Sequence, residues 1–522
     1  MRLADTAGLR RSYTSFNSAL ASLYENDLLE LADATNKPDF DDTAFFDAAG
    51  MVYNAGGFDP SQLNTPEARR LIAETLKQLD KAISSGVPHE VPEVVRYALE
   101  NNAFIFSGFK AFHTLREVGL SLTTDKGDIK PFETFRKDVE QVNNRYNHNY
   151  LYAEYNHAVG ASLMAARWQQ IEADGDRYDL QYRTAQDDRV REDHAILHGT
   201  TLPPSDPFWS LYLPPNGWNC RCTAVQVRRG KYPQSDPALS MLRGNNCTEA
   251  AKQQIFRFNP GKELKLFPPK HPYYKAPEAA KEVIEQLSEE QKREKRIADI
   301  IAELPEHLTE AEKKAVAENC LELEKSLGIT KGKPMSVDDA DKQHANPNYG
   351  TERGYGINCQ TCSPAYALRL RGFNVTAKSN TPGTKLDYLS RGNQLWEQWL
   401  NIDGTPAKHN SLNDWMQGKG YKKMTQKRYV EFFNEICKDT GVYMLSIGWK
   451  RGGGHATILQ RFADGTLRYI EPQHDNSKGS GREYCDLDYL GKNGAATNHS
   501  CRGIMRIDNK LFNTSFAEIF DK

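Results

Sequence analysis

The sequence predicts an α+β protein of several domains: a mainly helical N-terminal half, a helical connector, and a C-terminal domain with a helix packed on an antiparallel sheet. Its 522 residues are too many for one core and indicate two to four domains. Helical spacing of apolar residues dominates the first half, whereas a hairpin pattern marks the C-terminal part. We divide the chain into residues 1–65, 66–230, 231–345 and 346–522.

Composition and charge are those of globular domains, with 39% hydrophobic and 26% charged residues. The formal net charge of -2 gives no overall basic field, so contact with DNA is not indicated by charge. We expect no membrane-spanning helix, since no run of about twenty apolar residues occurs, and the first residues lack the apolar core of a signal peptide. Nine cysteines are too few for a disulfide scaffold and favour a reducing cytoplasm.

The N-terminal half is predicted to be helical from about residue 66 to 172, behind a peripheral region of mixed character at residues 1–65. In its clearest segment, apolar residues recur every three or four positions and predict a long core helix. His157 lies on that face and is expected to be a hydrogen-bonded core histidine rather than a ligand. The face consists of Tyr146, Tyr150, Ala153, His157, Gly160, Met164 and Trp168.

Residues 177–227 change to short strand-like runs with several prolines. Trp209 and Trp218 are large anchors for a compact, loop-rich substructure, and Pro214-Pro215-Asn216-Gly217 is a strong turn. Beyond about residue 262 the chain becomes rich in lysine and proline and then turns into charged helix.

A metal site is one interpretation of His194, His198, Cys220 and Cys222, because two histidines four residues apart share one face of a helix. Cys-x-Cys is, however, unusual spacing for a closed zinc site, and the neighbouring arginines and aspartates can form an ion-pair network instead. We favour a structural role for these residues, and predict no metal and no cofactor.

The helical connector is predicted at residues 275–328, with a charge density that leaves little core. Thr309-Glu310-Ala311-Glu312 is a capping box that begins a helix, and Gly328 is its stop. The apolar stripe of this helix is Val316, Cys320, Leu323 and Leu327.

Two pieces of the first half resemble the phage head-morphogenesis family of the Mu protein F type, the minor capsid proteins. They are Arg189-Val190-Arg191-x-x-His194 and the run from Pro214 to Cys222, and the resemblance covers about residues 66–227. It implies a minor head protein in the virion or procapsid, assembled in the host cytoplasm with portal and capsid or scaffold proteins. It implies no catalysis in this half, and the family also carries variable C-terminal toxin domains.

Cysteine chemistry in the second half would need a thiolate, a base and a group that orients the base. A helix is predicted with Pro364 in its first turn and Gly372 at its end, so that either Cys359 or Cys362 stands at or just before that turn. A helix N-terminus favours a thiolate through its partial positive charge and its N–H groups. Cys359, just ahead of the expected helix start, is the favoured nucleophile, and Cys362 is the alternative.

The expected base is His455, at the start of a strand that follows the glycine turn Gly452-Gly453-Gly454. Asp464-Gly465 makes a hairpin turn. Pairing Ala463 with Thr466 about that turn brings His455 near residues 471–473, where an acid should orient the imidazole.

Other interpretations of Cys359-x-x-Cys362 are half a zinc site, a thioredoxin-like redox pair and a buried inert pair. The C-terminal domain lacks a second Cys-x-x-Cys or a His-x-His pair for zinc, and no βαβ context accompanies the motif.

The same residues resemble the papain-fold toxin family of bacterial and phage polymorphic toxins, over about residues 346–505. The resemblance implies Cys359 as nucleophile, His455 as general base and Glu471 as the orienting residue, with Gln473 or Asn358 assisting. The family usually has aspartate where Glu471 stands, and glutamate is longer by one methylene. The matching pieces are Asn358-Cys359-x-x-Cys362 with Ala365-Tyr366, Arg371 to Ala377, Gly454-His455-Ala456, and Glu471-Pro472-Gln473.

The predicted chemistry is attack of the thiolate on an amide carbonyl to give an acyl-enzyme that water resolves. A glutamine side chain as substrate makes the enzyme a deamidase, and a peptide bond makes it a protease. The first hypothesis is therefore a capsid-associated toxin that acts on a protein, with an immunity partner left open. The alternatives are a purely structural head protein with a non-catalytic C-terminal binding domain, and a head-maturation protease.

Overall fold

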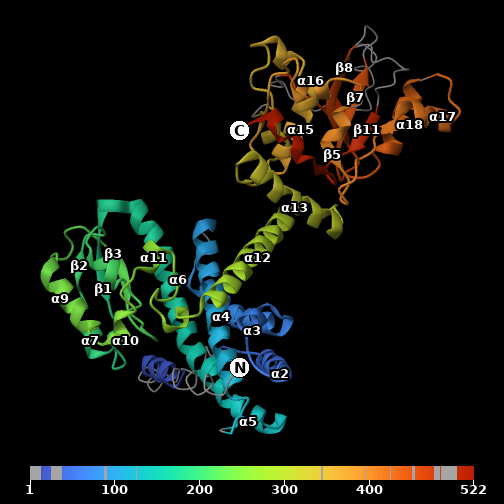
Figure 1. The fold of residues 1–522 in the computed structure, drawn as a ribbon. Helices are drawn as coiled ribbons and strands as arrows, with labels where there is room; N and C mark the ends of the chain where they lie inside the picture. The colour runs from blue at the N-terminus through green and yellow to red at the C-terminus, as the bar shows by residue number, and fades with distance from the viewer. Residues whose placement is uncertain are drawn as a thin grey trace. The chain divides into compact units, whose positions relative to one another are not determined.

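The computed structural model of the chain describes residues 13–24, 38–87, 91–124, 126–342, 345–392, 394–423, 425–448, 453–474, 482–483 and 503–522. The chain packs as two compact units, Met1–Lys292 and Arg293–Lys522, and passes from one to the other within helix α12 (Glu278–Glu303) (Figure 1). The combination of helices with antiparallel strands confirms the predicted mixed class.

The first unit is built on long helices, of which α6 (Leu151–Asp174) is the predicted core helix, preceded by a π-helical turn at Asn144–Tyr150. His157 of α6 is fully buried, and its Nε2 lies 3.0 Å from the carbonyl oxygen of Leu266. Burial lowers the pKa of this ring from 6.5 to about 4, so it is a neutral core histidine, as predicted. The other long helices are α2 (Asp42–Asn54), α3 (Pro66–Gly86), α4 (Glu93–Leu120) and α5 (Phe132–Asn143).

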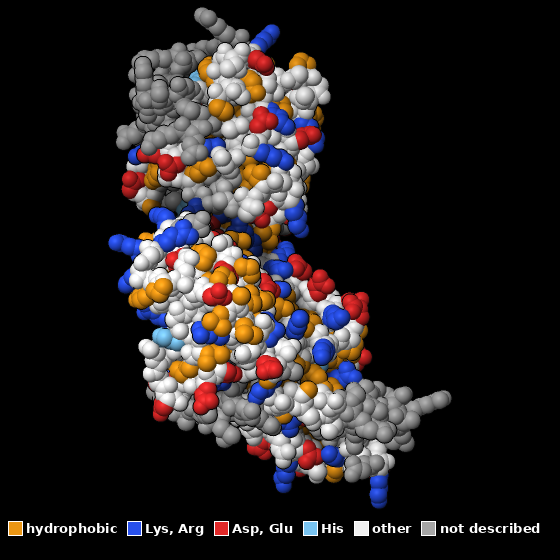
Figure 2. Space-filling view, turned by 90° about the vertical axis from the view of Figure 1, so that its left-hand side faces the viewer, with side chains coloured by type: hydrophobic (Ala, Val, Ile, Leu, Met, Phe, Trp, Pro, Cys, Tyr) orange, Lys and Arg blue, Asp and Glu red, His pale blue; other side chains and the backbone are white. Residues whose placement is uncertain are grey.

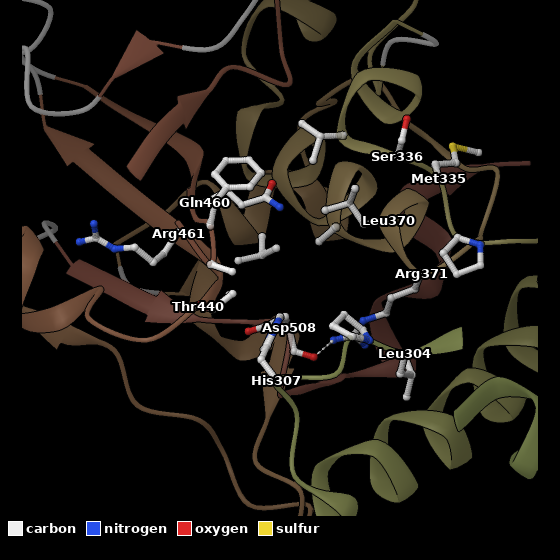
Figure 3. Close-up of a pocket in the computed structure, with 18 of the residues that line it drawn as sticks. Leu304, His307, Met335, Ser336, Leu370, Arg371, Thr440, Gln460, Arg461 and Asp508 are labelled. Carbon is white, nitrogen blue, oxygen red and sulfur yellow. Dashed lines mark hydrogen bonds and ion pairs between the residues drawn. The ribbon is translucent and has the colours of Figure 1, made fainter. Parts of the chain in front are cut away.

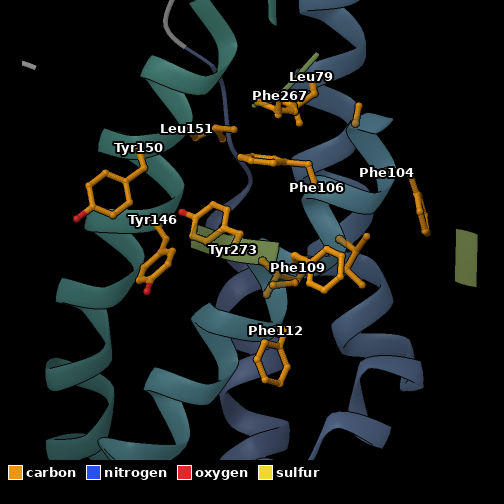
Figure 4. Packing of buried hydrophobic residues seen from close by; sticks show 14 of the residues in the cluster. Leu79, Phe104, Phe106, Phe109, Phe112, Tyr146, Tyr150, Leu151, Phe267 and Tyr273 are labelled. Atoms are coloured by element: carbon orange, nitrogen blue, oxygen red, sulfur yellow. The ribbon is translucent and has the colours of Figure 1, made fainter. Parts of the chain in front are cut away.

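Aromatic side chains fill the core between α4 and α6 (Figure 4). Phe106 of α4 stacks on Phe267 with ring centroids 3.7 Å apart, and Tyr273 lies within 5.3 Å of Phe106 and 6.1 Å of Tyr146. The segment that carries Phe267 and Tyr273 was expected to be a linker. It belongs to the core instead, because its large apolar side chains are inserted among the helices.

The N-terminal region was predicted to be peripheral, but part of it also belongs to the core. In α2, Phe45, Ala48 and Val52 recur at helical spacing and are fully buried in the core of the first unit, as is Leu63 just after it. Residues 1–12 and 25–37 lie outside the described part of the chain.

A buried ion pair lies inside this helical core. Lys110 Nζ of α4 is 2.5 Å from Glu154 Oε2 of α6, and the Tyr24 hydroxyl donates to Glu154 Oε1 over 2.8 Å. The Lys110 and Glu154 side chains are at most 1% exposed. Each charge is therefore tolerated only because the other is present.

Replacing Lys110 by methionine is expected to lower the free energy of unfolding by about 3–5 kcal/mol, since it leaves the Glu154 carboxylate buried without its cation. Urea unfolding followed by circular dichroism measures this. The control is the double variant Lys110→Met/Glu154→Leu, which removes both charges and should recover most of the loss. Equal losses in the single and double variants would contradict the argument.

A small sheet and short helices form the loop-rich substructure predicted for residues 177–227. Strand β1 (Tyr178–Arg183) pairs antiparallel with both β2 (Thr201–Leu202) and β3 (Thr223–Arg228). Trp209 and Trp218 are fully buried, which confirms them as anchors. The short helices within this stretch are α7 (Glu192–Ala195) and α8 (Phe208–Tyr212). Elsewhere in the first unit lie α9 (Pro237–Cys247), α10 (Ala251–Gln254), α11 (Pro260–Glu263) and the 3-10 turns Pro60–Asn64, Gly175–Arg177 and Pro272–Tyr274.

In the predicted connector, α13 (Glu310–Leu327) follows α12, and both of its predicted ends are confirmed. Thr309 and Glu312 form the capping box, and Gly328 ends the helix in the left-handed conformation (φ 66°). The connector has more core than its charge density suggested, because the apolar stripe of α13 is buried with the interior of the second unit. Helix α14 (Val337–Lys342) comes next.

The second unit is organised around a six-stranded sheet of order β10-β9-β8-β7-β11-β6 with antiparallel neighbours. Two further pairs of short strands, β12–β5 and β13–β4, form separate two-stranded sheets. The strands are β4 (Thr376–Ala377), β5 (Trp399–Leu400), β6 (Asn410–Ser411), β7 (Gly441–Gly448), β8 (Gly454–Arg461), β9 (Leu467–Ile470), β10 (Arg482–Glu483), β11 (Gly503–Arg506), β12 (Leu511–Phe512) and β13 (Phe520–Asp521).

Both faces of this sheet are covered, so β7 is buried along its whole length. Met444 points into the cluster that contains α15 (Cys359–Leu370), while Tyr443 and Leu445 point into the cluster of α17 (Leu412–Gly418) and α18 (Gln426–Ile436). The predicted arrangement of a helix on an antiparallel sheet is therefore present. The short elements are α16 (Lys385–Leu389) and the 3-10 turns Arg353–Gly356, Gln394–Gln398 and Thr514–Ile519.

The surface carries both signs of charge. On the face seen in Figure 2, lysine and arginine side chains are interspersed with aspartate and glutamate, in keeping with the net charge of -2. Among the described residues, no helix combines the length and apolar character needed to cross a membrane.

Candidate active site

Cys359 is the first residue of α15, which begins about one turn earlier than the sequence suggested. Pro364 therefore lies inside the helix rather than in its first turn. The carbonyl of Gln360, which a proline four residues later cannot engage, accepts a hydrogen bond from Gln398 Nε2 over 3.0 Å. This substitute donor allows the helix to extend back to Cys359, whose thiol is half-buried beside the first free N–H groups.

Cys362, the alternative nucleophile, points into the core. Its side chain is fully buried, and its thiol donates to Asn358 Oδ1 over 3.2 Å. Burial, together with the charges of Cys359 and Glu471, raises the pKa of this thiol well above 9.0. Cys362 is therefore a protonated core thiol, whereas Cys359 lines a cavity.

His455 is presented by β8, where it pairs with Ile447 of β7. The predicted hairpin from β8 to β9 is present, but the predicted register was wrong by one residue. Phe462, and not Ala463, is opposite Thr466, because the loop has three residues and ends at Gly465 with φ 85°. A one-residue shift changes which face a side chain occupies, and the observed register puts Glu471 on the same face as His455.

The histidine and the carboxylate make a direct contact. His455 Nε2 lies 2.6 Å from Glu471 Oε2, which also accepts a hydrogen bond from the Tyr469 hydroxyl over 3.0 Å. The backbone N–H of Gln473 donates to Glu471 Oε1 over 3.1 Å. Glu471 is thus held at both oxygens, and its extra methylene is accommodated. Nδ1 is the ring nitrogen left for Cys359, whose thiol donates to Gln360 Oε1 over 3.7 Å and whose proximity helps to raise the pKa of His455.

The electrostatics favour a charged histidine next to a charged glutamate. Burial lowers the pKa of His455, but hydrogen bonds with Cys359 and Glu471 and their charges outweigh it, and the pKa stands well above 6.5. Burial raises the pKa of Glu471, but the hydrogen bond and the charge of His455 lower it by more. The net result is a Glu471 pKa below 4.5. An imidazolium beside the thiol is the form that stabilises a thiolate.

Asn358 and Gln473, the predicted assisting residues, belong to one buried amide network. Gln473 Nε2 donates to Asn358 Oδ1 over 3.2 Å, and Asn358 Nδ2 donates to the carbonyl of Lys378 over 3.0 Å. Asn346 Nδ2 donates to the carbonyl of Gln473 over 3.0 Å, which ties the strand end to the helix start. Gln473 also lines the cavity, whereas Asn358 is fully buried and is not one of the lining residues.

The cavity above Cys359 and His455 has a volume of about 670 Å³. Sequence reasoning missed three of the residues involved: Gln360, Tyr469 and His474. Tyr469 could have been found from strand alternation, since it precedes Glu471 by two positions. Gly453 and Gly454 of the predicted turn line the opening, while Gly452 lies outside the described residues.

A second cavity in this unit, of about 350 Å³, is lined by residues such as Leu304, Met335 and Leu370 (Figure 3). An ion pair between His307 Nε2 and Asp508 Oδ2, 2.7 Å apart, lies at its side. It contains none of the predicted catalytic residues.

The histidines and cysteines of the first unit are only partly brought together. His194 lies beside Cys220 and Cys222 in a buried cluster, and Cys247 lies next to it, although the sequence pattern did not include it. His198 lies elsewhere, and its Nδ1 accepts a hydrogen bond from the backbone N–H of Thr184 over 3.2 Å.

Comparison with known proteins bears on the first unit. Residues 130–225 match the family described as Phage Mu protein F like protein. We call this stretch the Mu F-like region; it includes α6, β1 to β3 and the cluster around His194. Cys359, His455 and Glu471 lie outside it.

Two curated relatives are similar to this chain. The protein named "Putative capsid assembly protein F" of Escherichia phage Mu is 28% identical over 195 residues, which is 37% of this chain and 41% of that protein. The Mu-like prophage FluMu F protein of Haemophilus influenzae is 38% identical over 85 residues, 15% of this chain and 20% of that protein. The chain thus spans less than half the length of either relative. No solved structure matches the chain.

Proposed function

We propose that this chain is a minor phage head protein whose C-terminal unit is a papain-like cysteine hydrolase acting on protein amides. The enzymatic part rests on one observation: a half-buried cysteine at a helix start, a histidine with a raised pKa, and a carboxylate 2.6 Å from that histidine line or adjoin one cavity. A helix N-terminus packed on an antiparallel sheet supports the comparison with the papain fold.

The reaction follows from these positions. His455 accepts the thiol proton of Cys359, and the thiolate forms a bond to the amide carbonyl carbon. The oxyanion is met by N–H groups at the start of α15, and the amide of Gln473 at the cavity wall is the side chain placed to assist. His455 then gives its proton to the leaving nitrogen, so that ammonia or an amine departs. Water, activated by His455, hydrolyses the thioester and regenerates the thiol.

The role in the head is supported by the Mu F-like region and by the name of the phage Mu relative, which refers to capsid assembly. We propose that the first unit joins the procapsid through portal and capsid or scaffold proteins and places the second unit in the particle. The hydrolase would then be carried as cargo and act on a protein of another cell.

The test is the growth of a bacterial host that expresses the full chain. We expect harm from the wild type, and loss of harm in both Cys359→Ala and His455→Ala at equal protein levels. Equal harm from all three chains would contradict the catalytic proposal.

A truncated chain that is meant to contain the whole second unit should begin near residue 293 rather than 346, because α13 contributes buried residues to that unit.

Particles made without the gene test the head role separately. Electron microscopy should reveal defective or DNA-poor heads, and normal heads would remove the support for a role in assembly.

The head proteins of wild-type particles and of particles with Cys359→Ala test the alternative role in maturation. Cleavage of head proteins that depends on Cys359 would assign the hydrolase to maturation instead of toxicity.

A further inference from the structure

Four side chains from three segments of the first unit converge next to the small sheet. His194 is in α7, Cys220 and Cys222 lie on the stretch that leads into β3, and Cys247 is the last residue of α9. Helices α7 and α9 lie side by side in Figure 1 and are in contact. All four side chains are buried, and all three cysteines are free thiols.

The distances from His194 to Cys220 and Cys222 are those between ligands of a tetrahedral metal site. His194 Nδ1 lies 3.5 Å from Cys220 Sγ and 3.7 Å from Cys222 Sγ. A zinc ion with Zn–S bonds of about 2.3 Å and Zn–N bonds of about 2.0–2.1 Å places its nitrogen and sulfur ligands about 3.6 Å apart. The ligand atoms of these three residues all lie within 4.8 Å of one another. They occupy one face of such a tetrahedron.

Hydrogen bonding alone accounts poorly for this arrangement. A single imidazole nitrogen has one proton or one lone pair, so Nδ1 forms one full hydrogen bond with one of the two thiols or shares it between them. His194 Nε2 is buried and has no hydrogen-bond partner. A cation between Nδ1 and the two sulfurs would engage all three groups at once.

Cys247 is the best candidate for the fourth ligand. It is fully buried, and its sulfur lies within 4.8 Å of a ring nitrogen of His194, in a group with Asp193 that does not include Cys220 and Cys222. To bind the same ion, the Cys247 side chain would have to move closer to those two sulfurs. Asp193 is equally close, but its Oδ1 accepts from the backbone N–H of His194 over 2.9 Å and its Oδ2 from Gln253 Nε2 over 3.0 Å. The carboxylate is thus already engaged.

We propose that the first unit binds one zinc ion through His194 Nδ1 and the thiolates of Cys220, Cys222 and Cys247. Three sulfurs and one nitrogen in a tetrahedron are a ligand set typical of structural zinc. Binding forms four bonds to the ion and releases the three thiol protons to solvent. The Cys-x-Cys spacing that argued against a closed site is accommodated, since that motif supplies only two ligands and α7 and α9 supply the others.

The site would be structural, because four protein ligands leave no position for water or substrate. Its effect would be to tie α7, the approach to β3 and α9 together in a substructure with few strands. Since ligand binding to the folded state stabilises it, removal of the metal by a chelator should lower the melting temperature of the first unit.

Metal analysis of the purified full-length protein tests the proposal. Protein prepared without chelators should contain about one zinc per chain, as a single four-ligand site requires. Inductively coupled plasma mass spectrometry measures this content. Cys222→Ser and Cys247→Ser should each lose most of it. His198→Ala, Cys320→Ser and Cys359→Ala are the matched controls, because they alter a neighbouring histidine, another buried thiol and the Cys-x-x-Cys motif, and they should keep the metal.

Cobalt exchange into the wild type keeps the test valid if a cysteine variant fails to fold. We expect the ligand-field bands of tetrahedral cobalt and a charge-transfer band whose intensity corresponds to three thiolates. Folded wild-type protein that takes up neither metal would overturn the proposal, as would full zinc content in Cys222→Ser or loss of zinc only in Cys359→Ala. Full zinc in Cys247→Ser alone would refute that cysteine as the fourth ligand.

Discussion

Replacing Cys359 by serine is expected to abolish the harm that the full chain causes to a bacterial host and to remove its reactive thiol. Cys359 is the half-buried cysteine on the cavity wall, which it shares with His455, a histidine whose pKa is raised well above 6.5. A hydroxyl at this position cannot form a stable anion beside an imidazolium. Loss of the nucleophile should reduce turnover by about 10³-fold or more.

Alkylation with iodoacetamide measures this without knowledge of the substrate. Under native conditions, peptide mapping should find the modification on Cys359 in the wild type and on no thiol of this site in Cys359→Ser. The reagent reports on the thiolate, so the reaction should be faster than that of the same peptide after unfolding at neutral pH.

Cys362→Ala is the matched control for this prediction. Its thiol is fully buried and protonated, so the variant should keep alkylation at Cys359 and the harm to the host. It should instead lower the free energy of unfolding by about 1–2 kcal/mol, because a small cavity remains and Asn358 Oδ1 loses one of its hydrogen bonds. If Cys362→Ala removes the activity while Cys359→Ser keeps it, the assignment of the nucleophile is reversed.

Local patterns predicted the elements of this fold well. The periodicity of residues 146–168, the capping box at Thr309 and the glycine stop at Gly328 all correspond to observed features, because each depends on neighbours a few residues apart. What failed was the assignment of segments to cores. Phe267, Tyr273 and the stripe of α13 looked like parts of a linker, and only their burial by distant helices and strands reveals their role.

The candidate site was predicted in its residue types but not in its geometry. His455 and Glu471 could be paired because a hairpin is a local structure, yet the turn was misjudged by one residue, an error large enough to change the face of a strand. The start of α15 was misplaced because Pro364 is a common helix-start signal, and the compensating donor, Gln398, comes from a distant segment. Cys247 could not be joined to His194 from sequence for the same reason.

Replacing Glu471 by glutamine is expected to reduce turnover by about 10²- to 10⁴-fold, because the imidazolium of His455 loses the charge that orients and stabilises it. The hydrogen bond and charge of Glu471 are among the interactions that raise the pKa of His455. In Glu471→Gln that pKa should therefore fall, and His455 should lose its proton at a lower pH than in the wild type.

The pH dependence of alkylation separates this effect from a loss of fold. The rate of Cys359 alkylation should rise first as the thiolate–imidazolium pair forms. A thiolate paired with an imidazolium is a weaker nucleophile than one beside a neutral ring, so this rate should rise a second time, at higher pH, as His455 deprotonates. That second rise should move to lower pH in Glu471→Gln. Glu471→Asp keeps the charge but is shorter, and should shift it less, since the 2.6 Å contact is weakened rather than removed. Tyr469→Phe removes one hydrogen bond to the carboxylate and should have the smallest effect. An unchanged second rise in Glu471→Gln would mean that Glu471 holds the hairpin but does not tune the histidine.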